Sequence, residues 1–203
     1  MALVLKIDPV QPEADLLVQA VAVLKGGGVI AYPTETFYGL GVDAMNVKAV
    51  ERLFAVKGRD FNNPIRDVIG NVAQLNQVVT DVPPLAQELI NRHWPGPLTL
   101  VFGVAPSLFD RLTAGTGKIG VRISSHPIAR LLAGQLGGPL TSTSANRSGQ
   151  KECVTAQEVM EKIGDDLDLI LDGGATPGGK GSTIIDITQT PPVVLRVGVI
   201  DYP

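Results

Sequence analysis

The sequence predicts an α/β protein with a mixed parallel and antiparallel sheet and flanking helices. Short apolar runs typical of strands alternate with amphipathic helical stretches over most of the 203 residues, a pattern that indicates layered α/β architecture. The last two expected strands follow one another with only a short connection, which favours an antiparallel hairpin and hence a mixed sheet. No internal repeat or linker interrupts the pattern, so we expect one domain over residues 1–203.

Five segments have the apolar spacing of amphipathic helices. In the first, apolar residues from Leu16 to Leu24 share one face, and the glycines at 26–28 end the helix. In the last, Thr155 and Glu158 form a capping-box pattern ahead of the apolar positions. In chain order, the expected helices cover residues 16–24, 47–54, 85–90, 128–136 and 155–163.

The strands are predicted from short apolar runs that end at Gly, Pro or charged residues. In chain order, they are expected at residues 3–7, 29–32, 98–104, 119–123, around 140, and at 168–171, 183–187 and 193–196. Every apolar run is broken before it reaches the roughly 18 residues that a membrane helix needs. The apolar run at the N-terminus is also too short for a signal peptide.

Composition narrows the classes of function. A formal net charge of -3 argues against a generally basic protein that coats nucleic acid, although it leaves room for a local basic cavity. The single cysteine, Cys153, cannot form an internal disulfide and is expected to be a reduced thiol in a cytoplasmic protein. Two histidines are too few to indicate a zinc centre, and no acidic cluster resembles a metal cage, so no protein metal site is expected.

Two polar segments follow apolar elements in the first third of the chain. Residues 32–40 come directly after a strand, where open α/β sheets usually bind ligands, and Thr34 and Thr36 supply hydroxyl groups. Lys57 and Arg59 follow the second helix, and an ammonium and a guanidinium at this spacing suit an oligophosphate. Each segment has a structural alternative: the threonines cap a turn, and the two cations complement the helix dipole.

Further anion-binding candidates lie in the second half. Arg122 follows a strand and suits bidentate pairing with a substrate carboxylate, the alternative being a surface ion pair. Residues 141–149 are rich in hydroxyl groups that can bind phosphate or ribose, the alternative being a capped turn. Arg196 is another anion partner near the end of the last strand. The glycine-rich segment at 178–183 lacks P-loop spacing and leads into a strand, so a P-loop NTPase is rejected.

Seven motifs together resemble the YrdC/Sua5 family, the threonylcarbamoyl-AMP synthases. They occur in this order: Tyr-Pro-Thr-Glu-Thr-x-Tyr-Gly-Leu at 32–40, Lys-x-Arg at 57–59, Trp-Pro-Gly-Pro-Leu-Thr at 94–99, Val-Arg at 121–122, Ser-Thr-Ser-Ala-Asn-x-Ser-Gly at 142–149, Ser-Thr-Ile-Ile-Asp at 182–186 and Leu-Arg-x-Gly at 195–198. The resemblance spans residues 15–200 and is to the short bacterial form, without the extra C-terminal domain of longer members.

The resemblance implies a YrdC/RibB-like fold, a twisted sheet around a large, concave, positively charged cavity. It also implies a nucleotidyltransferase that converts L-threonine, bicarbonate and ATP to L-threonylcarbamoyl-AMP and pyrophosphate, with Mg2+ accompanying ATP. The product would pass to a downstream threonylcarbamoyl-transferase complex that forms N6-threonylcarbamoyladenosine in tRNA.

The resemblance also assigns roles to individual residues. It implies that Lys57 and Arg59 bind the phosphates of ATP and are the catalytic residues. It implies that the other residues in contact with ATP are Lys118, Ser144, Asn146 and Arg196. It implies that the residues in contact with threonine are Thr34, Arg122, Ser142 and Ser182.

Four positions depart from the family pattern. Asp60, Ser124 and Lys151 stand where many members have proline, and Val68 stands where many have histidine. These departures fall on the threonine side of the expected pocket and on the loop at 60–67.

Two other functions compete with the synthase. One is an RNA-binding module that uses a basic cavity to hold tRNA or other RNA without adenylate chemistry. The other is a carbamoyl-transfer domain that acts on another protein, and the absence of acylphosphatase-like and zinc-finger segments argues against it.

Overall fold

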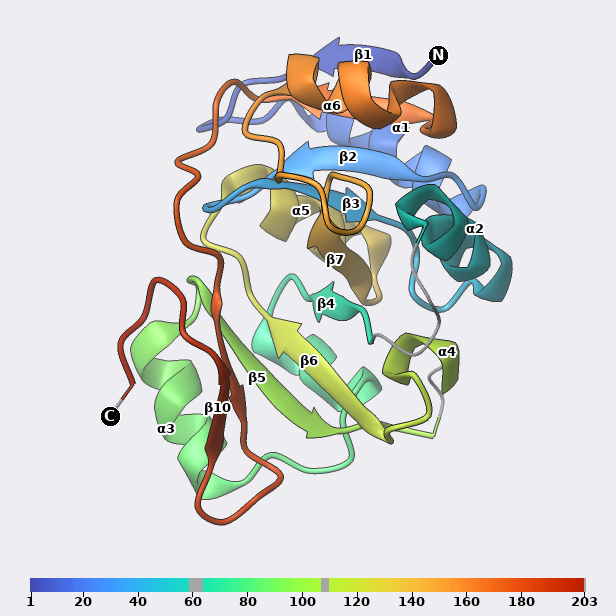
Figure 1. Ribbon diagram of the computed structural model, residues 1–203. Coiled ribbons are helices and arrows are strands. Elements are labelled where there is room, and N and C mark those ends of the chain that lie inside the picture. Colours follow the sequence, from blue (N-terminus) through green and yellow to red (C-terminus); the bar gives the residue numbers. More distant parts are fainter. Residues whose placement is uncertain (59–63, 107–109, 203) are drawn as a thin grey trace.

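The computed structural model describes residues 1–58, 64–106 and 110–202 (Figure 1). Ten strands form a sheet in the order β1-β8-β2-β3-β7-β4-β6-β5-β9-β10. The strands are β1 (Leu3–Lys6), β2 (Ile30–Pro33), β3 (Tyr38–Gly41), β4 (Arg66–Val68), β5 (Leu98–Gly103), β6 (Lys118–Arg122), β7 (Leu140–Ser144), β8 (Leu169–Asp172), β9 (Thr183–Asp186) and β10 (Val193–Arg196).

The sheet is mixed. The parallel pairs are β1–β8, β2–β8, β4–β6 and β5–β9. The antiparallel pairs are β2–β3, β3–β7, β4–β7, β5–β6 and β9–β10. The predicted fold class, a mixed sheet with flanking helices, is therefore confirmed, as is the C-terminal hairpin.

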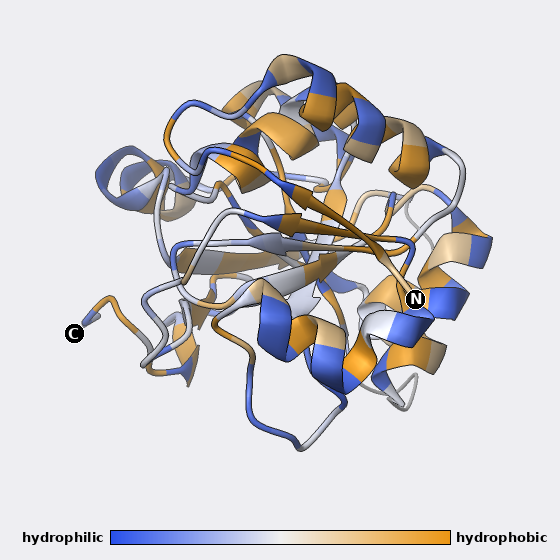
Figure 2. Ribbon diagram, turned by 90° about the horizontal axis from the view of Figure 1, so that it is seen from above, coloured by the Kyte–Doolittle hydropathy of each residue, from blue (hydrophilic) through white to orange (hydrophobic). Residues whose placement is uncertain are grey.

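Helices cover both faces of the sheet. The α-helices are α1 (Ala14–Lys25), α2 (Val47–Lys57), α3 (Pro84–His93), α4 (Asp110–Thr113), α5 (Pro127–Leu136) and α6 (Ala156–Ile163), and two 3-10 turns lie at η1 (Val72–Gln77) and η2 (Gly164–Asp166). Buried side chains of α1 and α5 share one hydrophobic cluster, and those of α2, α3 and α6 share a second. In Figure 2 the central strands are largely hydrophobic and the helices are amphipathic, as helices packed on one face require.

Local sequence explains where the helices begin and end. The side chain of Asn46 accepts a hydrogen bond from the Ala49 N–H at the start of α2, and Thr155 does the same for the Glu158 N–H at the start of α6. Gly58 ends α2 in the left-handed conformation, with φ of 55°, which glycine adopts without steric cost. The start and the end of α2 are therefore determined by local sequence, by Asn46 and Gly58.

Two strands of the sheet are absent from the sequence-based prediction. β3 contains Gly39 and Gly41, and glycine is a poor strand former on its own. Here the glycines are needed because a Cβ on Gly41 would lie 2.7 Å from the ring of Tyr32. β4 carries Arg66 and Asp67, whose charged side chains hide its strand character. Pairing with β6 and β7, rather than local propensity, makes β4 a strand.

Candidate functional site

A cavity of about 210 Å³ lies between the β2–β3 loop, the ends of β6 and β7, and the residues just before β9, and we call it the hydroxyl-rich cavity. Most of its polar lining consists of short alcohols and arginines. Its lining residues are Thr34, Thr36, Phe37, Tyr38, Gly39, Arg66, Thr99, Arg122, Ser142, Thr143, Ser144, Glu152, Gly179, Gly181, Ser182 and Arg196. Glu152 is the carboxylate among these described lining residues. The cavity thus brings together residues that are far apart in sequence.

A second cavity of about 380 Å³ adjoins the first, because Arg66 and Arg196 line both. We call it the apolar cavity. Its lining combines aliphatic side chains with one further cation and one acid: Pro64, Ile65, Arg66, Val101, Thr116, Lys118, Gly120, Ile184, Asp186, Leu195 and Arg196. An elongated ligand with an anionic part and a flat apolar part would suit the two together.

The predicted threonine-binding residues converge on the hydroxyl-rich cavity. Thr34, Arg122, Ser142 and Ser182 all contribute to its lining. The Thr34 hydroxyl also donates to the Phe37 carbonyl at 2.7 Å and accepts from the Thr36 N–H at 3.2 Å. Thr34 therefore has both of the roles considered from the sequence. It caps its own turn, and it also lines the cavity.

Arg196 and Ser182 form a rigid corner of this cavity. Nε and Nη2 of Arg196 donate to the Ser182 carbonyl at 2.9 and 2.7 Å, and Nη2 also lies 2.9 Å from the Ser182 hydroxyl. Burial lowers the pKa of Arg196, and the positive charge of Arg122 lowers it further. Two guanidinium groups that repel one another in a shared cavity are stabilised by an anion between them. The corner is therefore built to receive a negatively charged group.

Lys57 supports the cavity from behind. Its side chain is 3% exposed and is absent from the described lining of both cavities. Its Nζ donates to the Ser144 carbonyl at 2.6 Å and to Oδ1 of Asn146 at 2.8 Å. The Ser144 hydroxyl donates to the same Oδ1 at 2.6 Å. Of these three predicted nucleotide contacts, only Ser144 reaches the cavity surface; Lys57 and Asn146 lie one hydrogen bond away from it.

Lys118 lines the apolar cavity, and its Nζ lies 2.9 Å from Oδ2 of Asp186. Burial alone would raise the pKa of Asp186, but hydrogen bonds from Thr188, Lys118 and Gln189 outweigh burial and lower it to about 2. Asp186 therefore stays ionised and holds Lys118 at the cavity wall. The other predicted phosphate ligand, Arg59, lies outside the described residues, as does Asp60.

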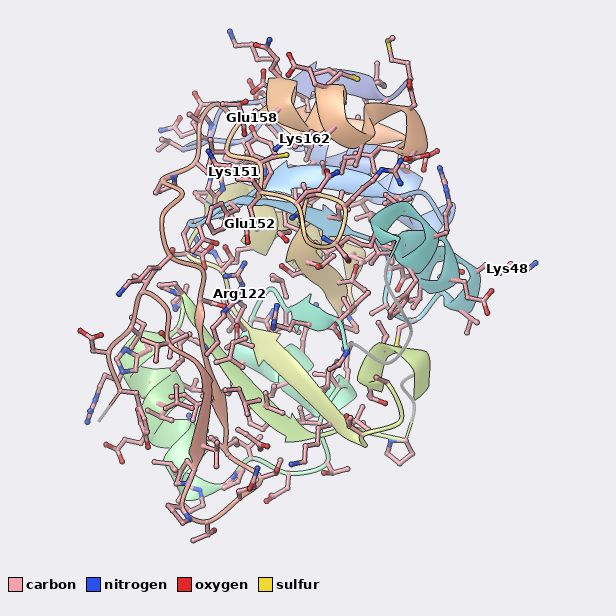
Figure 3. The ribbon with its side chains drawn as sticks, viewed as in Figure 1. Lys48, Arg122, Lys151, Glu152, Glu158 and Lys162 are labelled. Carbon is pink, nitrogen blue, oxygen red and sulfur yellow. The ribbon has the colours of Figure 1, made fainter. Side chains whose placement is uncertain are left out.

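Several lining residues escaped the sequence analysis. Arg66 and Glu152 line the hydroxyl-rich cavity, and Thr99 lies 2.9 Å from the Ser182 hydroxyl. Figure 3 shows Glu152 near Arg122, on the loop that follows β7. Arg66 was hidden because its strand was not predicted. Glu35 was visible within the Thr-Glu-Thr motif, but no pattern indicated its partners.

The profile of the Sua5/YciO/YrdC family, described as "Telomere recombination", matches residues 22–198. This chain belongs to that family. A threonylcarbamoyl-AMP synthase of Pyrococcus abyssi is 39% identical over 88% of this chain and 53% of its own length. A relative with the same name from Bacillus subtilis is 38% identical over 90% of this chain and also 53% of its own length. The chain therefore spans about half the length of these two relatives.

Solved structures of the family have the same fold. The crystal structure of Pyrococcus abyssi Sua5 complexed with L-threonine aligns with a TM-score of 0.94 and 36% identity, over 97% of this chain and 58% of that one. The crystal structure of Escherichia coli YciO aligns with a TM-score of 0.90 and 32% identity, over 99% of this chain and 98% of that one. The family fold thus extends over nearly the whole chain. None of the helices in the described ranges is long and apolar enough to cross a bilayer.

Proposed function

We propose that the chain is a threonylcarbamoyl-AMP synthase that converts L-threonine, bicarbonate and ATP to L-threonylcarbamoyl-AMP and pyrophosphate. The observation that carries the proposal is the convergence of Arg122 and Arg196 on one cavity lined by short alcohols. The names of the relatives, and the threonine held by a homologous structure, support the choice of substrates.

The two cavities suit the two substrates. In the hydroxyl-rich cavity, Arg122 would bind the threonine carboxylate while Thr34, Ser142 and Ser182 would offer hydrogen bonds to its hydroxyl and amine. Arg66 and Arg196 line the junction with the apolar cavity, where the phosphate chain would lie. The nucleoside would occupy the apolar cavity, with Lys118 on its wall.

The chemistry requires positioning more than acid-base groups. The unprotonated threonine amine reacts with bicarbonate-derived CO2 to give a carbamate, and a carbamate oxygen then attacks the α-phosphorus while pyrophosphate leaves. The arginines hold the two reacting groups within one cavity and offset the negative charge that develops at phosphorus. Lys57 contributes by fixing Ser144 through its hydrogen bond to the Ser144 carbonyl. Arg59 is proposed to bind phosphate on the family motif alone.

Mg2+ is proposed to arrive with ATP. The described residues contain no group of three or more His, Cys, Asp and Glu side chains placed to hold a metal. Mg2+ usually binds substrate phosphates and one or two carboxylates instead of an all-protein cage. Glu152 on the cavity lining is the residue that would hold it. When bound, the ion would neutralise phosphate charge. In the cell, the product would pass to a threonylcarbamoyl-transferase complex that modifies tRNA, and the site of action would be the cytoplasm.

The decisive experiment is release of pyrophosphate from ATP, together with detection of the adenylate by mass spectrometry. Release should require both threonine and bicarbonate, and Arg196→Met should abolish most of it. Arg92→Met is the matched control, because Arg92 lies in an exposed ion pair with Glu88 on α3, and it should leave the rate unchanged. Pyrophosphate release that ignores threonine and bicarbonate would refute the synthase. A salt-sensitive complex with tRNA in the absence of turnover would favour the RNA-binding module instead.

A further inference from the structure

Glu35 connects two parts of the sheet beside the hydroxyl-rich cavity. It lies in the loop between β2 and β3, whereas its partners lie at the end of β6 and just beyond it. Nη1 of Arg122 donates to Oε1 of Glu35 at 3.1 Å, and the Ser124 hydroxyl donates to Oε2. Both carboxylate oxygens are therefore bound, each by a different residue of the opposite segment.

This cluster is buried and held in place from behind. The side chains of Arg122 and Glu35 are 9% and 11% exposed, and Ser124 is fully buried. The Ser124 oxygen in turn accepts the backbone N–H of His126 at 3.1 Å, at the start of α5. A relay of hydrogen bonds thus runs from α5 through Ser124 and Glu35 to Arg122. Burial strengthens such a charge-assisted pair and limits its alternative geometries.

The guanidinium of Arg122 uses one of its two edges for Glu35. Glu35 takes Nη1, and in the described part of the chain Arg122 has no other side-chain hydrogen bond. Arg122 lines the cavity, whereas Glu35 is not among the described lining residues. The edge formed by Nε and Nη2 therefore remains for a ligand, and this edge can bind a carboxylate through two parallel hydrogen bonds.

We infer that Glu35, locked by Ser124, is a positioning residue that orients Arg122 toward the carboxylate of the amino-acid substrate. The inference rests on the proposed function, because it takes that carboxylate as the ligand of Arg122. Ser124 stands where many family members have proline, and proline has no hydroxyl group to hold Glu35.

The test separates binding of the amino acid from binding of the nucleotide. Pyrophosphate release is measured with varied threonine at saturating ATP, and with varied ATP at saturating threonine. In Glu35→Ala, a misoriented Arg122 should raise the KM for threonine by about tenfold, while the KM for ATP stays within about twofold of wild type. Glu35→Gln keeps an acceptor for Nη1 and should restore the threonine KM to within about threefold of wild type.

Ser124→Ala removes one of the two hydrogen bonds that Glu35 accepts, and it should raise the threonine KM by about threefold. This effect is smaller than that of Glu35→Ala because the hydrogen bond between Glu35 and Arg122 remains. The matched control is Glu88→Ala, which breaks an exposed glutamate–arginine pair on α3 and should change neither KM. Thermal unfolding verifies that each variant is folded. If Glu35→Ala does not fold, Ser124→Ala and Glu35→Gln decide the question.

The outcomes distinguish the two claims. If wild-type pyrophosphate release does not depend on threonine, the proposed function fails whatever the variants do. If wild type depends on threonine but folded Glu35→Ala and Ser124→Ala keep its KM, the positioning role is wrong and the synthase stands. Equal increases in both KM values would also overturn the positioning role, because they would indicate general damage to the site.

Discussion

Asp67 on β4 has a carboxyl group buried within the sheet. The residue is fully buried, and among the described residues neither carboxyl oxygen has a partner. Its neighbours across the sheet are Val121 on β6 and Thr141 on β7. Burial therefore raises the pKa of Asp67 well above 3.8 and favours the protonated form in the native protein.

The sign of the pH dependence follows from proton binding. Above pH 3.8 the unfolded chain has lost this proton while the native protein keeps it. Rising pH therefore favours unfolding by about 1.4 kcal/mol per pH unit, until the pKa of the buried group is reached. Even when protonated, an unpaired carboxyl costs about 1–3 kcal/mol of desolvation. Asp67 thus destabilises the fold at neutral pH.

Two substitutions separate these contributions. Asp67→Val removes both and suits a strand, so it should raise the free energy of unfolding by at least about 1–3 kcal/mol. Asp67→Asn removes the titration but keeps an unpaired polar group, so it should abolish the contribution of Asp67 to the pH dependence and recover less stability. The advantage of Asp67→Val over wild type should increase from pH 5 to pH 8 until the native pKa is passed.

The assay is urea unfolding followed by circular dichroism at pH 5, 6, 7 and 8. The control is Asp201→Asn, because Asp201 is exposed near the C-terminus and should change little at any of these pH values. A destabilised Asp67→Val would refute the reasoning. So would an advantage over wild type that stays constant across this range, since either result would mean that Asp67 is paired or ionised in the native protein.

Three further predictions concern Lys57, Asp186 and Gly70. Lys57→Met removes the hydrogen bonds to Ser144 and Asn146, so it should cost about 2–3 kcal/mol of stability and most of the pyrophosphate release. The control is Lys48→Met on the outer face of α2, where Figure 3 shows the side chain pointing away from the protein. It should change neither the stability nor the pyrophosphate release. Asp186, with its pKa lowered from 3.8 to about 2, should contribute about 2 kcal/mol above pH 4 that is lost as the pH falls through 2; an acid titration of unfolding in which Asp186→Asn matches wild type at neutral pH would contradict this. Gly70→Ala should destabilise the protein by about 1–3 kcal/mol because its Cβ would lie 2.5 Å from the backbone of Gly134. The control is Gly134→Ala in α5, whose Cβ would meet open space and which should not destabilise the protein in the same thermal unfolding experiment.

Five of the described α-helices and most strands could be predicted because their signals are local, whereas the four-residue α4 is too short to show an apolar period. The apolar face of α1 and the Thr155 cap of α6 depend on residues within a few positions of one another. β3 and β4 could not be predicted in this way. Gly41 is required by a ring from the neighbouring strand, and Arg66 and Asp67 are held in a strand by pairing with residues more than fifty positions away.

The sequence by itself determined the mixed α/β class, the positions of five of the six described α-helices and the family, because these depend on periodicity and on ordered motifs. It also identified Thr34, Arg122, Ser142, Ser144, Ser182 and Arg196 as candidates that the fold brings to one cavity. Only the tertiary structure decided which groups reach that cavity's surface. It places Lys57 behind Ser144 and places Glu35 against Arg122 and Ser124. The physical reason is that a side chain's chemical type is local, whereas its hydrogen-bond partners are set by how distant strands pack together.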